Sequence, residues 1–418
     1  MGAGKSATVL IDYLIKESEA NKWKFIIADT NKEQILLKTN NSRYAEAVKI
    51  DITQEEQRAK LIQRAHVVIS MMPPALHFFI AKDCVEYRKH LLTASYLDNN
   101  IKSLREEIVH RKLLFISEMG LDPGIDHMSA MHLIDSIKAK GGSVLSFKSH
   151  CGGLVAPESN NNPWHYKISW NPRNIVLAGK AGAHFKLAGN TISKNYTEIF
   201  TATTAVNIDG LGELAAYPNR DSLSYIPLYK LDTATTFIRT TLRYPGFCEG
   251  WNAIVQADLA NDTVAVETAG LSFAKWSKSI IPFVTEANKT MLQFLGLFDE
   301  ALVPIAATTA ADILQFLLET KLPMQPADKD LIVLLHEVEY QLNSTTHKIT
   351  SSLVVKGDDY QHTAMAKTVG LPLGIAAKLI LNGDVKLRGL HIPITKEIYE
   401  PVLKELAEVG IRFTEQES

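Results

Sequence analysis

Residues 2–29 read Gly-Ala-Gly-Lys-Ser-Ala-Thr-Val-Leu-Ile-Asp-Tyr-Leu-Ile-Lys-Glu-Ser-Glu-Ala-Asn-Lys-Trp-Lys-Phe-Ile-Ile-Ala-Asp, and they carry the clearest indication of the fold class. Its first six residues fit the pattern Gly-x-Gly-x-x-Gly/Ala and open a helical pattern at residues 8–19. The glycines permit a tight turn, and a pyrophosphate binds at the N-terminus of such a helix. The next apolar run ends in Asp29, which is either a turn residue or, at this distance from the glycines, an acid for ribose hydroxyls. We therefore predict a dinucleotide site formed by Gly2, Gly4, Lys5, Ser6, Ala7 and Asp29.

Short apolar runs alternate with helical patterns through the first third of the chain. The runs expected to be strands are 24–28, 47–50, 67–71, 91–95 and 113–117. Helical periodicity is present at 8–19, 54–64, 76–88 and 101–110. Strands that are apolar on both faces and alternate with helices are typical of a parallel sheet covered on both sides. The predicted fold class is α/β, with a Rossmann-type doubly wound parallel sheet in residues 1–121.

One strand of this sheet is missing from the pattern. A glycine motif of this kind normally follows a strand, but here it begins at residue 2. Without the first, central strand, the neighbouring strand edges are unpaired and the glycine loop is anchored at one end only. We expect a chain that begins too late, the alternative being a domain that tolerates the gap. An upstream extension of about six apolar residues, one strand in length, is expected to raise stability and cofactor affinity together.

From about residue 142 the pattern changes to longer strands. We expect one mixed sheet from strands at 143–149, 184–187, 195–199, 235–243, 331–342 and 349–355. Residues 251–322 carry apolar residues at three- and four-residue spacing and indicate a helical insert. A mixed-sheet α+β domain is thus predicted from residues 122–250 and 323–361, followed by C-terminal helices in residues 362–418.

Composition excludes several classes of protein. The 418 residues are 46% hydrophobic and 22% charged with a net charge of −2, which gives no reason to expect nucleic acid or an acidic membrane as partner. Three widely spaced cysteines and the absence of a secretory leader favour a reducing, cytoplasmic location. The apolar runs, such as residues 331–335, are read as too short to span a bilayer.

Polar and turn-forming residues concentrate between residues 118 and 170. Glycines and prolines there alternate with titratable side chains, which is how a loop-built site on a rigid scaffold looks. The titratable residues are Asp122, Asp126, His127, His150, Cys151 and Glu158. Their spacing matches no metal-ligand pattern, so no metal is expected.

Three segments of this region and beyond carry a family resemblance. Residues 118–127 and 149–170 resemble two signature segments of the saccharopine dehydrogenases of the glutamate-forming, saccharopine-reductase type. The segments Ala-Tyr-Pro-Asn-Arg-Asp-Ser at 216–222 and Thr-Leu-Arg-Tyr at 241–244 agree with it. The resemblance implies that the C-terminal helices return to the dinucleotide-binding domain. It also implies a reversible reaction that joins L-glutamate and 2-aminoadipate 6-semialdehyde through an imine, which a nicotinamide cofactor reduces to saccharopine.

Saccharopine carries three carboxylates, so its enzyme needs fixed cations. Arginine binds a carboxylate with two parallel hydrogen bonds. Arg220 and Arg243 lie in the family segments and are the predicted substrate cations, with Arg173 and Lys167 as weaker candidates. A lone arginine is otherwise most often a solvated surface charge.

The resemblance also places other residues at the substrate. Ser95, Tyr96, Cys151 and Trp170 are expected to line the pocket, although Tyr96 also fits a domain boundary. Tyr96 and Asp122 are the candidates for proton transfer, because imine formation and breakdown need acid–base help. His127 is either a pocket acid or a structural histidine, and the same choice applies to His150.

The remaining predictions about the cofactor concern its nicotinamide half and the choice between NAD and NADP. The family implies NADP, but an ionised Asp29 accepts hydrogen bonds from ribose hydroxyls and repels a 2′-phosphate. Lys32 is the one nearby cation, so we expect NAD(P)H binding with a preference for NAD(H). The predicted cofactor set is completed by Asp51, Met72, Pro73, Leu121 and Asp122.

Two other functions stay open at this point. A carboxynorspermidine-type polyamine dehydrogenase reduces an imine in the same way, but its substrate favours carboxylates where Arg220 and Arg243 stand. A non-catalytic NAD(P)-binding homologue is compatible with the missing strand. The expected partners are small amino-acid substrates, and the large sheet makes a homodimer reasonable.

Overall fold

The computed structural model describes residues 1–417, which form two compact units. The first unit comprises Met1–Lys140 and Gln361–Thr414, and the second comprises Gly141–Tyr360 together with residues 415–417. The boundary expected after residue 121 stays a prediction; the first unit, as a compact body, also includes the residues up to Lys140. The reason is helix α7 (Ile125–Ala139), which packs against α15 (Lys396–Glu408) of the first unit, with the Tyr399 hydroxyl donating to Asp135 at 2.6 Å.

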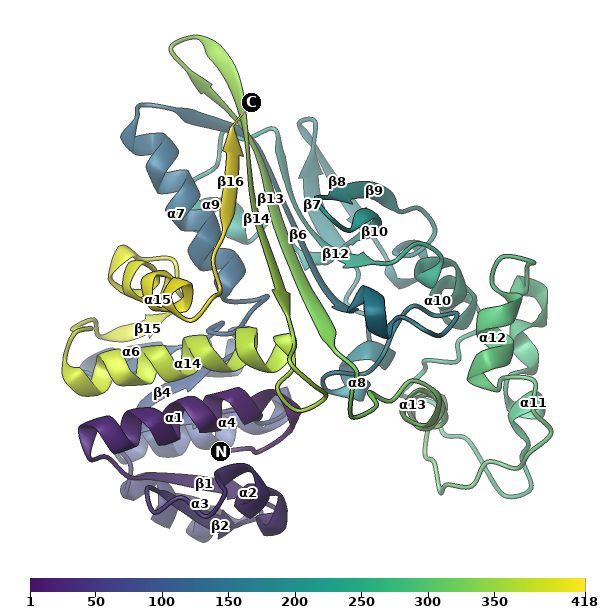
Figure 1. Cartoon of the computed structure of the whole chain (residues 1–418), viewed down its shortest axis with the longest axis horizontal. Coiled ribbons are helices and arrows are strands. Elements are labelled where there is room, and N and C mark those ends of the chain that lie inside the picture. Colours follow the sequence, from purple (N-terminus) through teal and green to yellow (C-terminus); the bar gives the residue numbers. More distant parts are fainter. Residues whose placement is uncertain (418) are drawn as a thin grey trace. The chain divides into compact units, whose positions relative to one another are not determined.

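Parallel strands covered by helices build the first unit, as the alternation predicted (Figure 1). The strands form two sheets, β1 (Phe25–Asp29) with β2 (Ala45–Lys49), and β15 (Gly389–His391)–β5 (Leu114–Ile116)–β4 (His90–Thr93)–β3 (Val67–Ser70). The helices are η1 (Lys5–Ala7), α1 (Thr8–Asn21), α2 (Lys32–Thr39), α3 (Glu55–Gln63), α4 (Pro74–Glu86), α5 (Asn99–Ser103), α6 (Arg105–His110), α7, α14 (Ala364–Asn382) and α15. Strand β15 lies in a segment expected to be helical throughout, and it was missed because three residues are too few to show a period of two.

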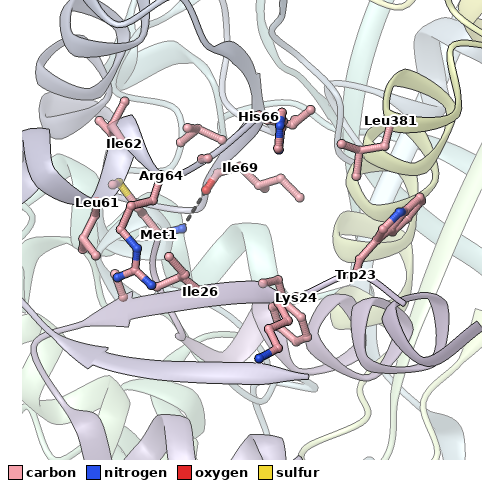
Figure 2. A pocket seen from close by; sticks show the side chains of 15 residues that line it. Met1, Trp23, Lys24, Ile26, Leu61, Ile62, Arg64, His66, Ile69 and Leu381 are labelled. Atoms are coloured by element: carbon pink, nitrogen blue, oxygen red, sulfur yellow. Dashed lines mark hydrogen bonds between the residues drawn. The ribbon is translucent and has the colours of Figure 1, made fainter. Parts of the chain in front are cut away.

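The first unit has a divided sheet. Among the described residues, Met1 and Gly2 lie between β1 and β3 and hydrogen-bond to both sides. The Gly2 N–H donates to the Ala28 carbonyl at 2.8 Å, the Met1 nitrogen donates to the Ile69 carbonyl at 2.7 Å (Figure 2), and the Met1 carbonyl accepts from Met71 at 2.8 Å. Among residues 1–417 no further residues pair with both β1 and β3, so the β1–β2 sheet and the β15–β5–β4–β3 sheet are separate.

Helix α14 is the apolar centre of the first unit and lies along α1 (Figure 1). Gly370 and Gly374 allow the close contact, since a Cβ added at Gly374 meets the Tyr13 ring at 2.5 Å and one at Gly370 meets Leu10 at 3.0 Å. By length and composition alone this helix is apolar enough to cross a membrane, which corrects the expectation that no segment is. It is mostly buried within the fold, as the core helix of a globular unit is.

A mixed ten-stranded sheet forms the second unit. Its main path is β11-β7-β12-β6-β13-β14-β16, with β10 on β12, β9 on β10 and β8 on β7. The strands are β6 (Ser143–Val155), β7 (Ala183–Leu187), β8 (Asn190–Lys194), β9 (Thr204–Ile208), β10 (Gly212–Pro218), β11 (Arg220–Asp221), β12 (Thr236–Arg243), β13 (Asp330–Leu342), β14 (Thr345–Lys356) and β16 (Thr414–Glu417). The mixed sheet was predicted, but its size was underestimated because the short edge strands carry little pattern.

One expected strand of the second unit is a helical turn. Residues 195–199 contain η3 (Tyr196–Glu198), where Asn195 and Glu198 form a reciprocal capping box. The Glu198 carboxylate accepts from the Asn195 N–H at 2.9 Å. This side chain satisfies a backbone donor that a strand would pair with a neighbour, so the local hydrogen bond overrides the β-branched composition.

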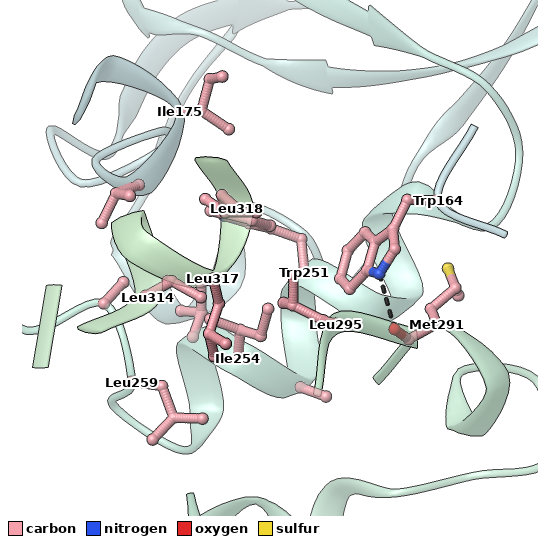
Figure 3. Close-up of a cluster of buried hydrophobic side chains, with 14 of the residues drawn as sticks. Trp164, Ile175, Trp251, Ile254, Leu259, Met291, Leu295, Leu314, Leu317 and Leu318 are labelled. Atoms are coloured by element: carbon pink, nitrogen blue, oxygen red, sulfur yellow. Dashed lines mark hydrogen bonds between the residues drawn. The ribbon is translucent and has the colours of Figure 1, made fainter. Parts of the chain in front are cut away.

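The helical segment 251–322 shares one core with the rest of the second unit and is not a separate body (Figure 3). Trp164 packs edge-on against Trp251 with ring centroids 6.2 Å apart, and its indole N–H donates to the Met291 carbonyl at 2.7 Å. Leu314 and Leu318 lie in the same cluster. The helices of this unit are η2 (Pro157–Ser159), α8 (Pro172–Val176), η3, α9 (Tyr225–Tyr229), α10 (Phe247–Gln256), α11 (Phe273–Trp276), η4 (Lys278–Phe283), α12 (Lys289–Leu295) and α13 (Ala310–Lys321).

Candidate active site

The glycine loop lies at the start of α1, where the motif predicted it. Gly2 has φ +92°, and a Cβ there would approach the Met71 carbonyl oxygen to 2.8 Å, so only glycine fits. Gly4 precedes η1, which Lys5, Ser6 and Ala7 form, and no side chain caps this turn. The start of a helix carries backbone N–H groups and the positive end of the helix dipole, which suit a phosphate.

Asp29 reaches back to this loop from the end of β1. Its Oδ2 accepts from the Ala3 N–H at 2.7 Å, and its Oδ1 accepts from the Asn31 N–H at 3.0 Å. The carboxylate is therefore fixed by two backbone donors beside the loop. This geometry supports both readings of the residue, since it orders a turn and presents an acid where an adenosine ribose is expected.

A cation that the sequence analysis missed contacts the same loop. Lys38, in the last turn of α2, donates from Nζ to the Gly4 carbonyl. Burial lowers the pKa of Lys38 to about 8, while the nearby Asp29 opposes that shift. Lys32 was predicted instead because it follows Asp29 closely in sequence. Lys32 begins α2, however, and the helix carries Lys38, almost two turns further along, to the loop.

Asp51 is engaged in its own turn. Its Oδ1 accepts from the Thr53 N–H at 2.9 Å and from the Thr53 hydroxyl at 2.7 Å, and these hydrogen bonds lower its pKa. This is the arrangement of a turn-forming aspartate ahead of a helix, here α3. A cofactor role for Asp51 stays a prediction without support from these contacts.

A buried hydrogen-bond chain links the ends of β3 and β4. The Ser70 hydroxyl lies 2.7 Å from His77 Nδ1, and His77 Nε2 lies 2.7 Å from the Ser95 hydroxyl. His77 comes from α4, directly after the Met72–Pro73 segment expected at the nicotinamide. His77 was not predicted from the sequence, because it lies within a helix and its two partners come from the ends of two different strands. The chain fixes the orientation of Ser95, a predicted substrate residue.

His77 makes the stability of the first unit depend on pH. Burial lowers the pKa of His77 from 6.5 to about 4, so the folded protein keeps it neutral where the unfolded chain binds a proton. Stability from this group is complete above pH 6.5 and decreases as the pH falls toward 4. A shift of this size corresponds to roughly 3 kcal/mol. Urea unfolding at pH 7 and pH 4.5 should show this loss in the parent chain and a smaller one in His77→Gln. Equal losses would contradict the assignment.

Tyr96 and Asp122, the two residues predicted to handle protons, meet in the structure. The Tyr96 hydroxyl donates to Asp122 Oδ1 at 3.3 Å. Leu121 and Asp122 enter the turn that leads into α7, and the Asp122–Pro123 peptide is cis. The pair therefore places a phenol and a carboxylate in direct contact at the carboxyl ends of parallel strands, where ligands of such sheets bind.

A second buried pair holds the Tyr96 segment in place. Glu118 accepts from the Leu97 N–H at 3.0 Å through Oε1, and its Oε2 lies 2.8 Å from His127 Nε2. The Glu118 N–H also donates to the Ser95 carbonyl at 3.0 Å. Of the two readings of His127, these contacts favour the structural one.

In the second unit Arg243 is the centre of an aromatic cluster. Its guanidinium lies 5.3 Å from the Tyr166 and Phe247 ring centroids and 6.0 Å from that of Tyr217. Trp170, a predicted substrate residue, donates its indole N–H to the Tyr166 hydroxyl at 3.1 Å. Arg243 and Trp170, two predicted substrate residues far apart in sequence, thus both contact Tyr166.

Arg243 is a buried cation without an acidic partner in the described chain. Its exposure is 5%, its Nη1 donates to the Leu242 carbonyl at 2.8 Å, and its Nε has no hydrogen-bond partner among residues 1–417. The buried Cys151 contributes to its electrostatic surroundings. A buried guanidinium with spare donors is costly unless an anion joins it.

The other predicted cations differ in their surroundings. Arg220 lies on the short edge strand β11, is exposed, and has φ +52°. Arg173 pairs with Asp312, and Lys167 lies 2.6 Å from Asp328. Arg173 and Lys167 are therefore occupied by protein carboxylates, which makes them poorer substrate ligands. The structure does not place Arg220 in the Arg243 cluster.

His150 lies on β6 between two partners. Its Nδ1 is 2.7 Å from the Thr240 hydroxyl, and its Nε2 is 2.9 Å from Glu337 Oε2. The hydrogen bond from His150 lowers the pKa of Glu337. Both nitrogens are satisfied, which again favours the structural reading. Within residues 1–417 no group of three or more His, Cys, Asp or Glu side chains is arranged to hold a metal.

Family models, curated relatives and solved structures all place this chain near the same family. The model of the saccharopine dehydrogenase NADP binding domain matches residues 1–115, and that of the saccharopine dehydrogenase C-terminal domain matches residues 120–411. The alpha-aminoadipic semialdehyde synthase of Arabidopsis thaliana is 35% identical over 89% of this chain and 38% of its own length. The NADP-dependent, L-glutamate-forming saccharopine dehydrogenase of Saccharomyces cerevisiae is 31% identical over 100% of this chain and 98% of its own.

Solved structures agree with these matches. The apo, L-Glu-forming saccharopine dehydrogenase from Saccharomyces cerevisiae superimposes with a TM-score of 0.88 at 30% identity, covering 100% of this chain and 98% of that one. The homospermidine synthase of Legionella pneumophila, at 8% identity and a TM-score of 0.61, shares the fold alone. The chain spans less than half the length of the plant relative and of the mouse alpha-aminoadipic semialdehyde synthase, of which it covers 47%.

Proposed function

The chain belongs to the saccharopine dehydrogenase family, and on that premise we propose that it catalyses the reversible, nicotinamide-dependent formation of saccharopine from L-glutamate and 2-aminoadipate 6-semialdehyde. The cofactor, NAD(P)H, supplies a hydride to the imine carbon. The chain's own residues bind it, hold the substrate carboxylates and move protons.

The observation that carries this proposal is the buried, unpaired Arg243. A planar guanidinium binds a carboxylate through two parallel hydrogen bonds, and its free Nε is one of the donors needed. Tyr166 and Phe247 flank the cation and exclude water, which strengthens its attraction for an anion. Such a site fits an amino-acid substrate and repels a polyamine. Arg243 therefore favours saccharopine over the carboxynorspermidine alternative.

Proton transfer is assigned to Tyr96 and Asp122. Imine formation releases water and imine hydrolysis adds it, so a group must donate a proton to the carbinolamine oxygen or withdraw one. The phenol and the carboxylate share a hydrogen bond, so a proton passing through one is relayed to the other. The Ser70–His77–Ser95 chain and the Glu118–His127 pair position this segment without touching the reacting atoms.

In the cofactor site we assign the pyrophosphate to the η1–α1 start and the adenosine ribose to Asp29. The three cysteines, Cys84, Cys151 and Cys248, are buried and form no disulfide, which supports a reducing compartment such as the cytoplasm. A homodimer through the large second-unit sheet stays part of the proposal.

A direct assay tests the function. Oxidation of saccharopine is followed by reduced-cofactor absorbance, with carboxynorspermidine as the competing substrate and cofactor binding measured separately by fluorescence. Saccharopine turnover supports the proposal, and carboxynorspermidine turnover favours the polyamine alternative. Cofactor binding without any turnover favours the non-catalytic homologue. No binding of cofactor at all contradicts all three.

Asp29 and Lys38 are expected to oppose one another in the choice between NADH and NADPH. The sequence alone predicted an NAD(H) preference of about tenfold, or about 1.4 kcal/mol. Lys38 adds a positive charge at the glycine loop that weakens that argument. We expect Asp29→Ser to shift the ratio of specificity constants toward NADPH, and Lys38→Ala to shift it toward NADH, each by about tenfold. Lys32→Ala, outside the loop contact, is the matched control. Shifts in the opposite directions would reverse the assignment.

A further inference from the structure

His77 is the middle member of a hydrogen-bond chain that begins in the core of the first unit and ends at a partly exposed serine. The Ser70 hydroxyl, which is fully buried, lies 2.7 Å from His77 Nδ1. His77 is 2% exposed, and its Nε2 lies 2.7 Å from the hydroxyl of the partly exposed Ser95. Of the three side chains, Ser95 is therefore the one that a ligand can reach.

The buried end of this chain decides which ring nitrogen of His77 carries the proton. Burial lowers the pKa of His77 to about 4, so the ring is neutral at neutral pH and holds one proton. A proton on Nδ1 would be donated to Ser70, and the Ser70 proton would then need a further acceptor. Among the described residues the Ser70 hydroxyl makes no other hydrogen bond, and solvent does not reach it. Because a buried donor without an acceptor is costly, Ser70 donates to Nδ1, and the ring proton lies on Nε2.

Thr93 does not change this assignment. Its hydroxyl lies 3.5 Å from His77 Nε2, at the limit of a hydrogen bond, and accepts from the Ser95 N–H at 3.3 Å. So weak a contact does not outweigh the 2.7 Å hydrogen bond that Ser70 makes at Nδ1. The Nε2 proton is therefore directed at the nearer Ser95 oxygen.

We propose that His77 is a positioning residue that keeps the Ser95 hydroxyl as a hydrogen-bond donor for a carboxylate of the substrate. A serine hydroxyl can donate or accept, and a fixed donor behind it removes that freedom. Since the Ser95 oxygen already accepts from His77, its own proton points away from the chain, toward a ligand. Ser95 directly precedes Tyr96, whose hydroxyl donates to Asp122. The donor thus belongs to the same segment as the pair assigned to proton transfer.

A carboxylate fits this donor better than the other groups expected nearby. Carboxylate oxygens only accept hydrogen bonds, an ammonium group only donates them, and the carboxamide of a nicotinamide does both. A hydroxyl held as a donor before binding also saves the ordering that a freely turning one would need. The identity of the acceptor rests on the proposed function, whereas the direction of the Ser70–His77–Ser95 chain does not.

Two amide variants of His77 test this role with the same functional group. His77→Gln places its amide N–H near the position of Nε2 and still donates to Ser95, whereas the shorter side chain in His77→Asn reaches only Ser70. We expect His77→Asn to raise the KM for saccharopine by about tenfold, with kcat within about threefold, because the hydrogen bond is made equally before and in the transition state. His77→Gln should recover most of this loss.

Ser95→Ala sets the upper limit of the effect. It should raise the KM for saccharopine by about 10- to 100-fold, the effect of losing one hydrogen bond to a charged group. Because His77 acts through Ser95, adding His77→Asn to Ser95→Ala should raise KM no further, whereas a purely structural loss would add. The cofactor dissociation constant should stay within about twofold in every variant. A changed cofactor affinity with an unaltered KM would assign the Ser95 proton to the cofactor and overturn the proposal.

The tautomer of His77 is measured by NMR on the unmodified chain, without substrate. With nitrogen-15 in the histidine rings, the signals missing from His77→Gln identify His77, and we expect Nε2 protonated and Nδ1 not. A protonated Nδ1 overturns the inference whatever reaction the chain catalyses, and it does so even where a variant fails to fold. Equal KM values for the two amide variants, or additive losses in the double variant, also overturn it. A parent chain that does not turn over saccharopine but has Nε2 protonated contradicts the proposed function and the carboxylate acceptor, and leaves the direction of the hydrogen-bond chain confirmed.

Discussion

Arg243→Ala is expected to reduce kcat/KM for saccharopine by about 30- to 5,000-fold, or about 2–5 kcal/mol, while the dissociation constant of the cofactor stays within twofold. The reason is the burial of Arg243 among aromatic rings, where a substrate carboxylate has no water to replace the lost partner. Arg243→Lys should recover only part of the loss, since an ammonium lacks the planar pair of donors. Steady-state kinetics and cofactor titration check both statements.

Arg173→Ala is the matched control for charge, because Arg173 is already paired with Asp312. Its effect on kcat/KM is expected to stay within a few-fold. Arg220→Ala carries the other prediction made from the sequence, a large loss of saccharopine use with little change in cofactor binding. Since the Arg220 side chain is exposed, water screens its charge, and we expect a smaller loss than at Arg243. An unchanged kcat/KM in Arg243→Ala removes that residue from the substrate site.

Tyr96→Phe is expected to lower kcat by about 10²- to 10⁴-fold with little change in cofactor affinity, which is the range of general acid–base help. The substitution removes the hydroxyl that donates to Asp122 and keeps the ring. Loss of one hydrogen bond should reduce folding stability by only about 1 kcal/mol, so the variant stays folded.

The pH dependence of the rate separates a chemical role of Tyr96 from a structural one. If Tyr96 and Asp122 relay a proton, Tyr96→Phe should lose one limb of the kcat–pH profile, and Asp122→Asn should alter the same limb. Tyr87→Phe, at the end of α4, serves as the control and should leave the profile unchanged. A Tyr96→Phe enzyme with the parental rate and profile would rule out the phenol as a proton carrier.

Features that are encoded within a short run of residues were predictable from the sequence, even where they determine the fold of a whole unit. The glycine motif, the helix after it and Asp29 lie within thirty residues, and their spacing alone predicts the loop that Asp29 fixes through Ala3. The alternation of apolar runs gave the parallel strands for the same reason. The gap before Gly2 was visible too, since the motif has a fixed place after a strand, and the structure shows the divided sheet that follows from it.

Partners supplied by separate elements were not predictable. His77 contacts residues at the ends of two different strands, and Lys38 reaches the glycine loop only because α2 turns it there. Strand β15 is three residues long and is stabilised by pairing with β5, not by its own propensity. Of the predicted substrate cations, the family segments favoured Arg243 and Arg220 equally. Only burial separates them, and burial is set by the whole sheet.

The pairing of β15 with β5 also has a consequence for how the protein is made. Leu114 must wait for Gly389, more than two hundred residues later, before the edge of the first-unit sheet is complete. At ordinary rates of translation this delay is roughly 10–60 s, during which residues 141–360 have emerged and begun to fold. Residues 1–140, although synthesised before the second unit, are therefore expected to complete their sheet only after residue 391 has emerged. On the ribosome they present apolar strand edges to chaperones through most of synthesis.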